Sequence, residues 1–374
     1  MWLKEKEIEM EIPMNKVKLM NGKQAIVRNL IEGFGFGSTE FHVLRASNVI
    51  LPEWIHLYVR QQTVLDEAAR HFTGAVGQQR VPQDFLANIK IPLPPITIQK
   101  EIADYLQYRL TRVEEAKQAV KAELEAAKSL KQAYLREVFG TADDTDSGIT
   151  PIMPNPKKGK SEQSASSFKS AILTSDTVKL GDMCEIKDGT HFSPKNLSEG
   201  DYKYITAKNI KEYRLDFSKL TYVSAKDHKE IFSRCPVSLG DVLYIKDGAT
   251  AGIACENTLD EEFSLLSSVA LLKPNKKIVT STYIVYFLNS GIGRKLMLDQ
   301  VDGGAITRLT LTKISNSKIP LPPLAVQKEI ADYLQAKFTT VDTLVLALTE
   351  KKKAIDDLPQ AFLREVFSIA DDTD

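Results

Sequence analysis

The chain has 374 residues, which is enough for two globular domains and helical spacers, and its 49 basic and 49 acidic residues cancel. Bulk charge therefore neither indicates nor excludes a nucleic-acid partner, because a local basic face would leave the total unchanged. The three cysteines show no CxxC spacing, which argues against a zinc cluster and a disulfide framework. No apolar run approaches the ~20 residues that cross a bilayer. These features predict a soluble protein in the cytoplasm.

The first hundred residues contain turn and helix signals. The glycine-spaced segment at 33–41 favours a loop that leads into a strand. Residues 52–71 place apolar side chains on one helical face, and residues 74–86 return to turns and short strands. We interpret 1–96 as a first globular domain.

A long internal repeat organises the whole chain. Residues 91–146 recur at 319–374 with an offset of 228 and no gap, and 31 of the 56 aligned residues are identical. Internal repeats fix the architecture before any other signal. The chain therefore contains two copies of one module.

Each repeat opens with Pro-Leu-Pro-Pro, so a helix has to start after it, because proline lacks an amide proton and clashes inside a helix. Apolar residues then recur at steps of three and four, close to a heptad period. This pattern predicts two long helices, 97–140 and 325–368, that pack on each other as an antiparallel-type coiled coil. Pro359 predicts a kink or a restart, with Asp356 or Asp357 as a cap.

A segment rich in proline, serine and charge, 141–176, is predicted to be a flexible linker. Residues 177–324 then form a second domain of short strands and helices, so the fold class is α+β. Its later part aligns with the first domain, for example Tyr283 with Trp54 and Arg308 with Arg80. About seventy residues precede Gly248 in the second copy and only twenty-one precede Gly22 in the first. We therefore expect the first domain to be shortened.

Two variable domains, each followed by a block of the form IPLPP, QKEIADYL and LREVF, resemble the specificity subunit of type I restriction-modification systems. The segments GFGSTEFHVLRA (35–46) and GDVLYIKDGATAG (240–252) also resemble parts of that family's target recognition domains. The resemblance implies a non-catalytic subunit that binds a bipartite double-stranded DNA target. It further implies that the paired helices set the gap and dock two methyltransferase subunits, which restriction subunits join.

The sequence predicts no catalytic activity for the chain itself. It has no Asn/Asp-Pro-Pro-aromatic motif and no P-loop, and its histidines show no metal spacing. No metal or cofactor is expected; by the resemblance, S-adenosylmethionine, ATP and Mg²⁺ belong to the partner subunits. The alternative that this chain is an enzyme acting alone would require methyltransferase activity of the purified chain.

DNA reading needs donors on loops that reach base edges, and cations for phosphates. The second domain offers such residues in GTHFSPK, AKNI, KDGAT and TRLT, and the first domain offers weaker counterparts. The alternative for each of them is an ordinary solvated loop residue without a role in binding. The predicted DNA-binding residues are Thr190, His191, Ser193, Lys195, Lys208, Asn209, Lys246, Thr250, Thr307, Arg308, Asn21, Lys23, Ser38, Thr39 and Arg80.

Identity between the repeats extends to positions outside the apolar stripe. A recent duplication would explain this, but the domains between have diverged far more, which favours two equivalent docking surfaces. The predicted partner-docking residues are Gln99, Lys100, Glu101, Asp104, Arg136, Glu137, Gln327, Lys328, Glu329, Asp332, Arg364 and Glu365. The alternative is a truncated scaffold or decoy that binds methyltransferase but reads one half-site or none.

Overall fold

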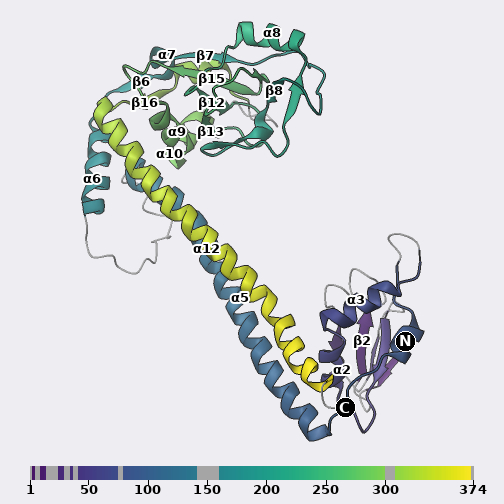
Figure 1. The fold of residues 1–374 in the computed structure, drawn as a ribbon. Coiled ribbons are helices and arrows are strands. Elements are labelled where there is room, and N and C mark those ends of the chain that lie inside the picture. Colours follow the sequence, from purple (N-terminus) through teal and green to yellow (C-terminus); the bar gives the residue numbers. More distant parts are fainter. Residues whose placement is uncertain are drawn as a thin grey trace. The chain divides into compact units, whose positions relative to one another are not determined.

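The computed structural model describes residues 2–4, 9–13, 24–28, 34–36, 41–74, 79–140, 160–299 and 308–371. They form two compact units, which we call unit 1 (Met1–Leu124 with Leu346–Asp374) and unit 2 (Glu125–Val345). Each unit combines a globular domain with one part of each long helix, α5 (Ile96–Phe139) and α12 (Leu324–Asp371) (Figure 1). The division thus differs from the five predicted segments, because each domain shares a core with both helices.

The two long helices begin directly after their Pro-Leu-Pro-Pro segments, as predicted. Buried positions recur every seven residues, as the heptad pattern predicts, at Val113, Val120 and Ala127 on α5 and at Leu334, Val341 and Leu348 on α12. The helices are antiparallel within each unit. In unit 1 Lys117 pairs with Asp356 and Glu123 with Lys351; in unit 2 Lys131 pairs with Asp342, and Glu137 accepts from the Tyr333 hydroxyl. The fold class α+β with two mutually packed long helices is confirmed.

Pro359 lies inside α12 and does not restart it. The predicted cap role of Asp356 is wrong, because this carboxylate accepts a hydrogen bond from Lys352 one turn earlier and pairs with Lys117. Both lysines hold the pKa of Asp356 below its usual range.

The central sheet of unit 2 is antiparallel, in the order β13 (Ala254–Glu256), β12 (Val242–Ile245), β15 (Val269–Pro274) and β7 (Cys184–Asp188). Side chains alternate between two cores: Val242 and Tyr244 join a core with the long helices, whereas Leu243 and Ile245 join a second core. Both faces are therefore buried.

A second sheet of unit 2 has the order β11 (Thr221–Val223), β8 (Tyr202–Ile205) and β14 (Ser264–Leu265). Two short pairs complete the strands, β9 (Ile210–Lys211) with β10 (Arg214–Leu215) and β6 (Thr177–Lys179) with β16 (Lys318–Pro320). The remaining helices are α7 (Leu180–Met183), η3 (Ala207–Asn209), α8 (Ala225–Arg234), α9 (Ser281–Asn289), α10 (Gly291–Leu298) and α11 (Leu311–Asn316).

The linker prediction is wrong for residues after 159. Helix α6 (Lys160–Leu173) buries Ala165, Phe168 and Ile172 at helical spacing, and Phe168 and Ile172 join the core of unit 2. Its serine-rich composition concealed this apolar stripe. Residues 141–159 lie outside the described residues.

Unit 1 has a three-stranded antiparallel sheet in the order β3 (Ala25–Ile26), β2 (Glu9–Pro13) and β5 (Phe41–Arg45). A further pair joins β1 (Trp2–Lys4) and β4 (Phe34–Phe36). The predicted helix 52–71 is two helices, α2 (Pro52–Tyr58) and α3 (Gln62–Arg70), and α4 (Gln83–Asn88) follows. No described helix is long and apolar enough to cross a membrane.

Two equivalent glutamines attach the domains to the long helices. In unit 1 the Gln99 amide accepts from the Leu51 amide and donates to the carbonyls of Val49 and Pro94. In unit 2 Gln327 makes the same three bonds, to Thr280, Ile278 and Pro322. Both side chains are 0 % exposed.

This burial contradicts the docking role predicted for Gln99 and Gln327. Their identity in the two repeats is explained inside the chain, because each buried side chain bonds three backbone groups near a helix start. A second matched pair strengthens the equivalence: Gln360 donates to the Arg60 carbonyl in unit 1 and Gln132 to the Asn289 carbonyl in unit 2.

Candidate nucleic-acid interface

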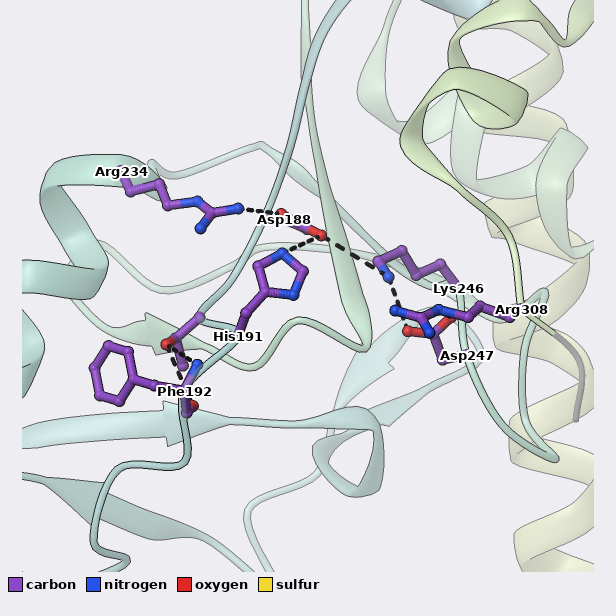
Figure 2. Close-up of polar contacts among 8 residues, drawn as sticks. Asp188, His191, Phe192, Arg234, Lys246, Asp247 and Arg308 are labelled. Carbon is purple, nitrogen blue, oxygen red and sulfur yellow. Dashed lines mark hydrogen bonds and ion pairs between the residues drawn. The ribbon is translucent and has the colours of Figure 1, made fainter.

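A buried carboxylate anchors the polar cluster of unit 2. Asp188, at the end of β7, has a side chain only 6 % exposed. Its Oδ1 accepts from Arg234 at 3.1 Å, and its Oδ2 lies 3.2 Å from His191 Nε2 and 3.8 Å from Lys246 Nζ (Figure 2). Charges so poorly hydrated persist only when paired. Asp188 therefore fixes groups from three separate segments.

A second carboxylate extends the cluster. Asp247 Oδ2 lies 2.8 Å from Lys246 Nζ, and its Oδ1 lies 3.8 Å from Arg308 Nε (Figure 2). Backbone pairing between Asp247 and Arg308 holds the two segments together. Lys246 is buried between the acids, whereas the side chains of Arg234, His191 and Arg308 are 56, 48 and 70 % exposed. The cluster thus presents two anchored arginines and a histidine to solvent.

A hollow of about 320 Å³ lies where two predicted DNA-reading loops meet. Ser193 and Asn196 line it from GTHFSPK and its continuation, and Thr206 and Lys208 line it from the loop after β8. Tyr204 and Ser268 also line it, and their hydroxyls are buried without a hydrogen-bond partner. Burial raises the pKa of Tyr204 to about 12, so its hydroxyl remains a neutral donor. Of the lining residues Ser193, Asn196 and Lys208 are exposed, and their side chains are donors and acceptors of the kind that read base edges.

Three residues predicted to contact DNA bases or phosphates are buried and bind groups of the chain itself, so these predictions are wrong. Thr190 is 3 % exposed, and its hydroxyl accepts from the Phe192 amide within the loop. Asn209 is 1 % exposed and forms a capping box with Thr206. Lys246 is 3 % exposed and neutralised by Asp188 and Asp247. All three side chains support the surface loops from below and are not accessible to DNA.

The other predicted residues fall into two groups. His191, Ser193, Lys195, Lys208, Thr250 and Arg308 are exposed in unit 2, and Arg80 is exposed in unit 1, where its backbone pairs with Thr73. Asn21, Lys23, Ser38, Thr39 and Thr307 lie outside the described residues. The structure therefore brings together His191 and Arg308 at the carboxylate cluster, and Ser193 and Lys208 at the hollow.

Sequence reasoning missed Arg234 and Asp188. Arg234 closes helix α8, which begins with a Ser224 cap and reads as an ordinary amphipathic surface helix. Asp188 precedes glycine, and aspartate beside glycine usually indicates a turn. Their pairing joins residues 46 positions apart, which no local pattern reveals.

The predicted docking residues other than the two glutamines lie on the surfaces of the long helices. Lys100, Glu101 and Asp104 are exposed in unit 1, and Lys328, Glu329 and Asp332 are exposed in unit 2. Near the other helix ends Glu137, Arg364 and Glu365 are exposed and Arg136 is half-buried; Glu137 also contacts the Tyr333 hydroxyl. Each unit therefore presents the same exposed triad, Lys-Glu-x-x-Asp.

The cysteines are packing residues. Cys184, Cys235 and Cys255 are unpaired and buried, and burial raises the pKa of each thiol to about 12. Across the described ranges no group of three or more metal-ligating side chains comes together.

We expect none of the three thiols to react with Ellman's reagent at pH 8 in the native chain, because the thiolate is the nucleophile and burial disfavours it. All three should react once the chain is unfolded in urea. Fast labelling of the native chain would contradict the buried placement.

Comparison with known proteins agrees with this architecture. The family model of the type I restriction modification DNA specificity domain matches residues 10–126 and 173–354, which is most of the chain. The chain belongs to this family. The type I restriction enzyme EcoBI specificity subunit of Escherichia coli is 24 % identical over 308 residues, covering 79 % of this chain and 61 % of that protein. The MjaVIII specificity subunit of Methanocaldococcus jannaschii is 22 % identical over 293 residues, covering 76 % and 62 %.

Two solved structures share the fold. A chain from a type I R-M system, studied for complex assembly and conformational transition, superposes with a TM-score of 0.72 at 22 % identity and covers 98 % of this chain and 82 % of its own. The HsdS subunit from Thermoanaerobacter tengcongensis gives a TM-score of 0.56 at 21 % identity, with 96 % and 80 % covered. The chain thus spans less than two thirds of the length of the EcoBI and MjaVIII specificity subunits.

Proposed function

We propose that this member of the specificity family reads a split double-stranded DNA sequence for a type I restriction-modification complex. The observation that carries the proposal is the surface of unit 2 around Asp188 and the neighbouring hollow. It combines two anchored, exposed arginines, Arg234 and Arg308, with the exposed polar side chains of Ser193 and Lys208 at the hollow, which matches the two needs of DNA reading: phosphate positioning and base-edge contact. The identity of the matched family supports the same conclusion.

The chain's part in such a complex is recognition and assembly rather than chemistry. The exposed Lys-Glu-x-x-Asp triads of the two units are equivalent surfaces that suit two copies of one partner, which we assign as methyltransferase subunits. Restriction subunits would join through that complex in the cytoplasm. S-adenosylmethionine, ATP and Mg²⁺ are assigned to those partners, as the family resemblance implies.

Replacing Arg234 and Arg308 by alanine should weaken DNA binding at every sequence and flatten its salt dependence. Each phosphate contact that is lost lowers the slope of log K against log salt by about 0.9. Among the described residues each arginine pairs with one carboxylate, and its side chain is 56 or 70 % exposed, so a guanidinium with five donors can also contact phosphate. The measurement is fluorescence anisotropy of a labelled duplex from 50 to 200 mM salt.

Lys318→Ala is the matched control, because Lys318 is an exposed cation on β16, outside the loops that carry the cluster. The double arginine variant should bind with a slope lower by about two, and the control with an unchanged slope. Equal slopes for all three proteins would show that phosphate does not contact this cluster.

One observation favours a second candidate, a scaffold that reads a single half-site. The described part of unit 1 contains no counterpart of Asp188, because the three-stranded sheet β3-β2-β5 matches only β13-β12-β15 of unit 2. A chain with one reading surface and two docking surfaces would still assemble. Selection from a randomised duplex library separates the two candidates.

A further inference from the structure

Phe192 is an exposed aromatic residue in the loop that connects the carboxylate cluster of unit 2 with the hollow. Its relative exposure is 38 %. The residue before it, His191, belongs to the cluster through Asp188, and the residue after it, Ser193, lines the hollow. Single exposed apolar side chains are common on protein surfaces. Phe192 differs from them because both of its neighbours are exposed polar residues of the surface that we propose to read DNA.

The loop holds the backbone of Phe192 in a fixed place. The Thr190 amide donates to the Leu265 carbonyl at 2.8 Å, and the Thr190 carbonyl accepts from the Ser267 amide at 2.9 Å. The Thr190 hydroxyl accepts from the Phe192 amide at 3.1 Å and donates to the Phe192 carbonyl at 3.3 Å (Figure 2). A Cβ atom at Gly189 would lie 1.9 Å from the Leu265 carbonyl oxygen, so the loop passes very close to β14. Such anchoring leaves little backbone freedom to be lost when a ligand binds.

The exposure of the ring indicates what kind of DNA contact it can make. In the major groove, the thymine C5 methyl is the apolar group on the base edges, and phenylalanine is one of the side chains that contact it. Insertion between two base pairs would require most of the side chain to project from the surface. A ring that is 38 % exposed offers only an edge or part of a face. An apolar contact with a base edge is therefore favoured over intercalation.

We propose that Phe192 contacts the C5 methyl group of a thymine in the half-site that unit 2 reads. This inference rests on the proposed function and assigns one base to one residue. Arg234 and Arg308 would hold the phosphates. Ser193 and Lys208 would bind polar groups of neighbouring bases at the hollow. The Phe192 ring would exclude water from the methyl group, and a base without this methyl would leave the ring partly hydrated.

Replacing thymine by deoxyuridine removes this methyl group and no hydrogen-bonding atom. The duplex selected by the full chain with its methyltransferase partner is resynthesised with deoxyuridine at one thymine at a time, and each affinity is measured by fluorescence anisotropy. At one thymine the wild-type chain should bind about fourfold more weakly, which corresponds to about 0.8 kcal/mol, the value of one buried methyl group. Phe192→Ala should bind the thymine and deoxyuridine duplexes equally at that position.

Three further variants distinguish a contact of the ring from a general loss of structure. Phe192→Leu keeps an apolar side chain and should retain part of the preference for thymine. Thr190→Val removes the hydroxyl that holds Phe192 and should reduce the preference, although Thr190 is itself only 3 % exposed. Leu239→Ala is the control and should keep the full preference. Leu239 is 50 % exposed and precedes β12, whereas Lys246 of the cluster follows the other end of that strand.

Three results would overturn the proposal and leave DNA recognition intact. The first is a selected duplex in which no deoxyuridine substitution changes the affinity. The second is a preference for thymine that Phe192→Ala retains in full. The third is a rise in the fluorescence of 2-aminopurine in the bound duplex that requires Phe192 and occurs without a preference for thymine, since this would indicate intercalation. If no duplex is selected at all, the proposed DNA recognition itself fails, so the two failures are distinguishable.

Discussion

Replacing Gln327 by alanine is expected to lower the free energy of unfolding of unit 2 by at least about 2 kcal/mol. The side chain is 0 % exposed and serves three backbone groups, the Thr280 amide and the carbonyls of Ile278 and Pro322. Leaving a buried donor or acceptor without a partner costs about 1–3 kcal/mol each, and relaxation or water recovers part of that. The Gln99→Ala substitution should destabilise unit 1 in the same way.

Urea denaturation followed by circular dichroism, with hydrogen exchange to locate the loss, measures the effect. Gln327→Leu keeps most of the volume and removes the hydrogen bonds, so it separates cavity formation from lost polar contacts. Gln107→Ala is the matched control, because Gln107 is an exposed glutamine of α5. If Gln327→Ala and Gln107→Ala unfold at the same urea concentration, the glutamine does not hold the domain on its helix.

Alanine at Lys100, Glu101 and Asp104 together with Lys328, Glu329 and Asp332 should abolish co-purification with the methyltransferase subunit. All six side chains are exposed, and each unit presents three of them at equivalent places. Removing one triad should leave one partner bound, because the surfaces lie on separate units. Co-expression with a tagged methyltransferase, followed by native mass spectrometry, counts the bound partners.

A control variant tests whether any loss of surface charge has this effect. Lys121, Glu125 and Lys353 are exposed on the same two helices, at positions that differ between the repeats. Their replacement by alanine should leave assembly intact. Full assembly of the sextuple variant would show that the triads do not dock the partner. A recent duplication would then explain why the two repeats are identical at these positions.

Much of the architecture followed from periodicity. The Pro-Leu-Pro-Pro segments and the heptad spacing predicted both long helices close to their observed starts, Ile96 and Leu324. The alignment of Tyr283 with Trp54 also proved structural, since both donate to the carbonyl of the second repeat residue, Pro320 and Pro92. Such features are local or repeated, so the sequence alone displays them.

Several errors concern polar residues with partners inside the chain. Gln99 and Lys246 have residue types typical of surfaces, yet they bind Leu51 and Asp188, which are distant in sequence. Asn209 is instead used locally, in the capping box with Thr206. The type of side chain does not reveal which segment will pack over it. For the same reason Asp188 was not recognised, although it organises the cluster from which the DNA surface is built.

The measurement that tests the central claim most directly is selection from a randomised duplex library by this chain bound to its methyltransferase partner, at a stated salt concentration. The proposed function predicts two short sequence blocks separated by a fixed gap. Arg308→Ala with Arg234→Ala should weaken the complex for all sequences without moving the gap. Recovery of no sequence preference would contradict DNA recognition by this chain, and recovery of a single block would assign reading to one unit and favour the scaffold.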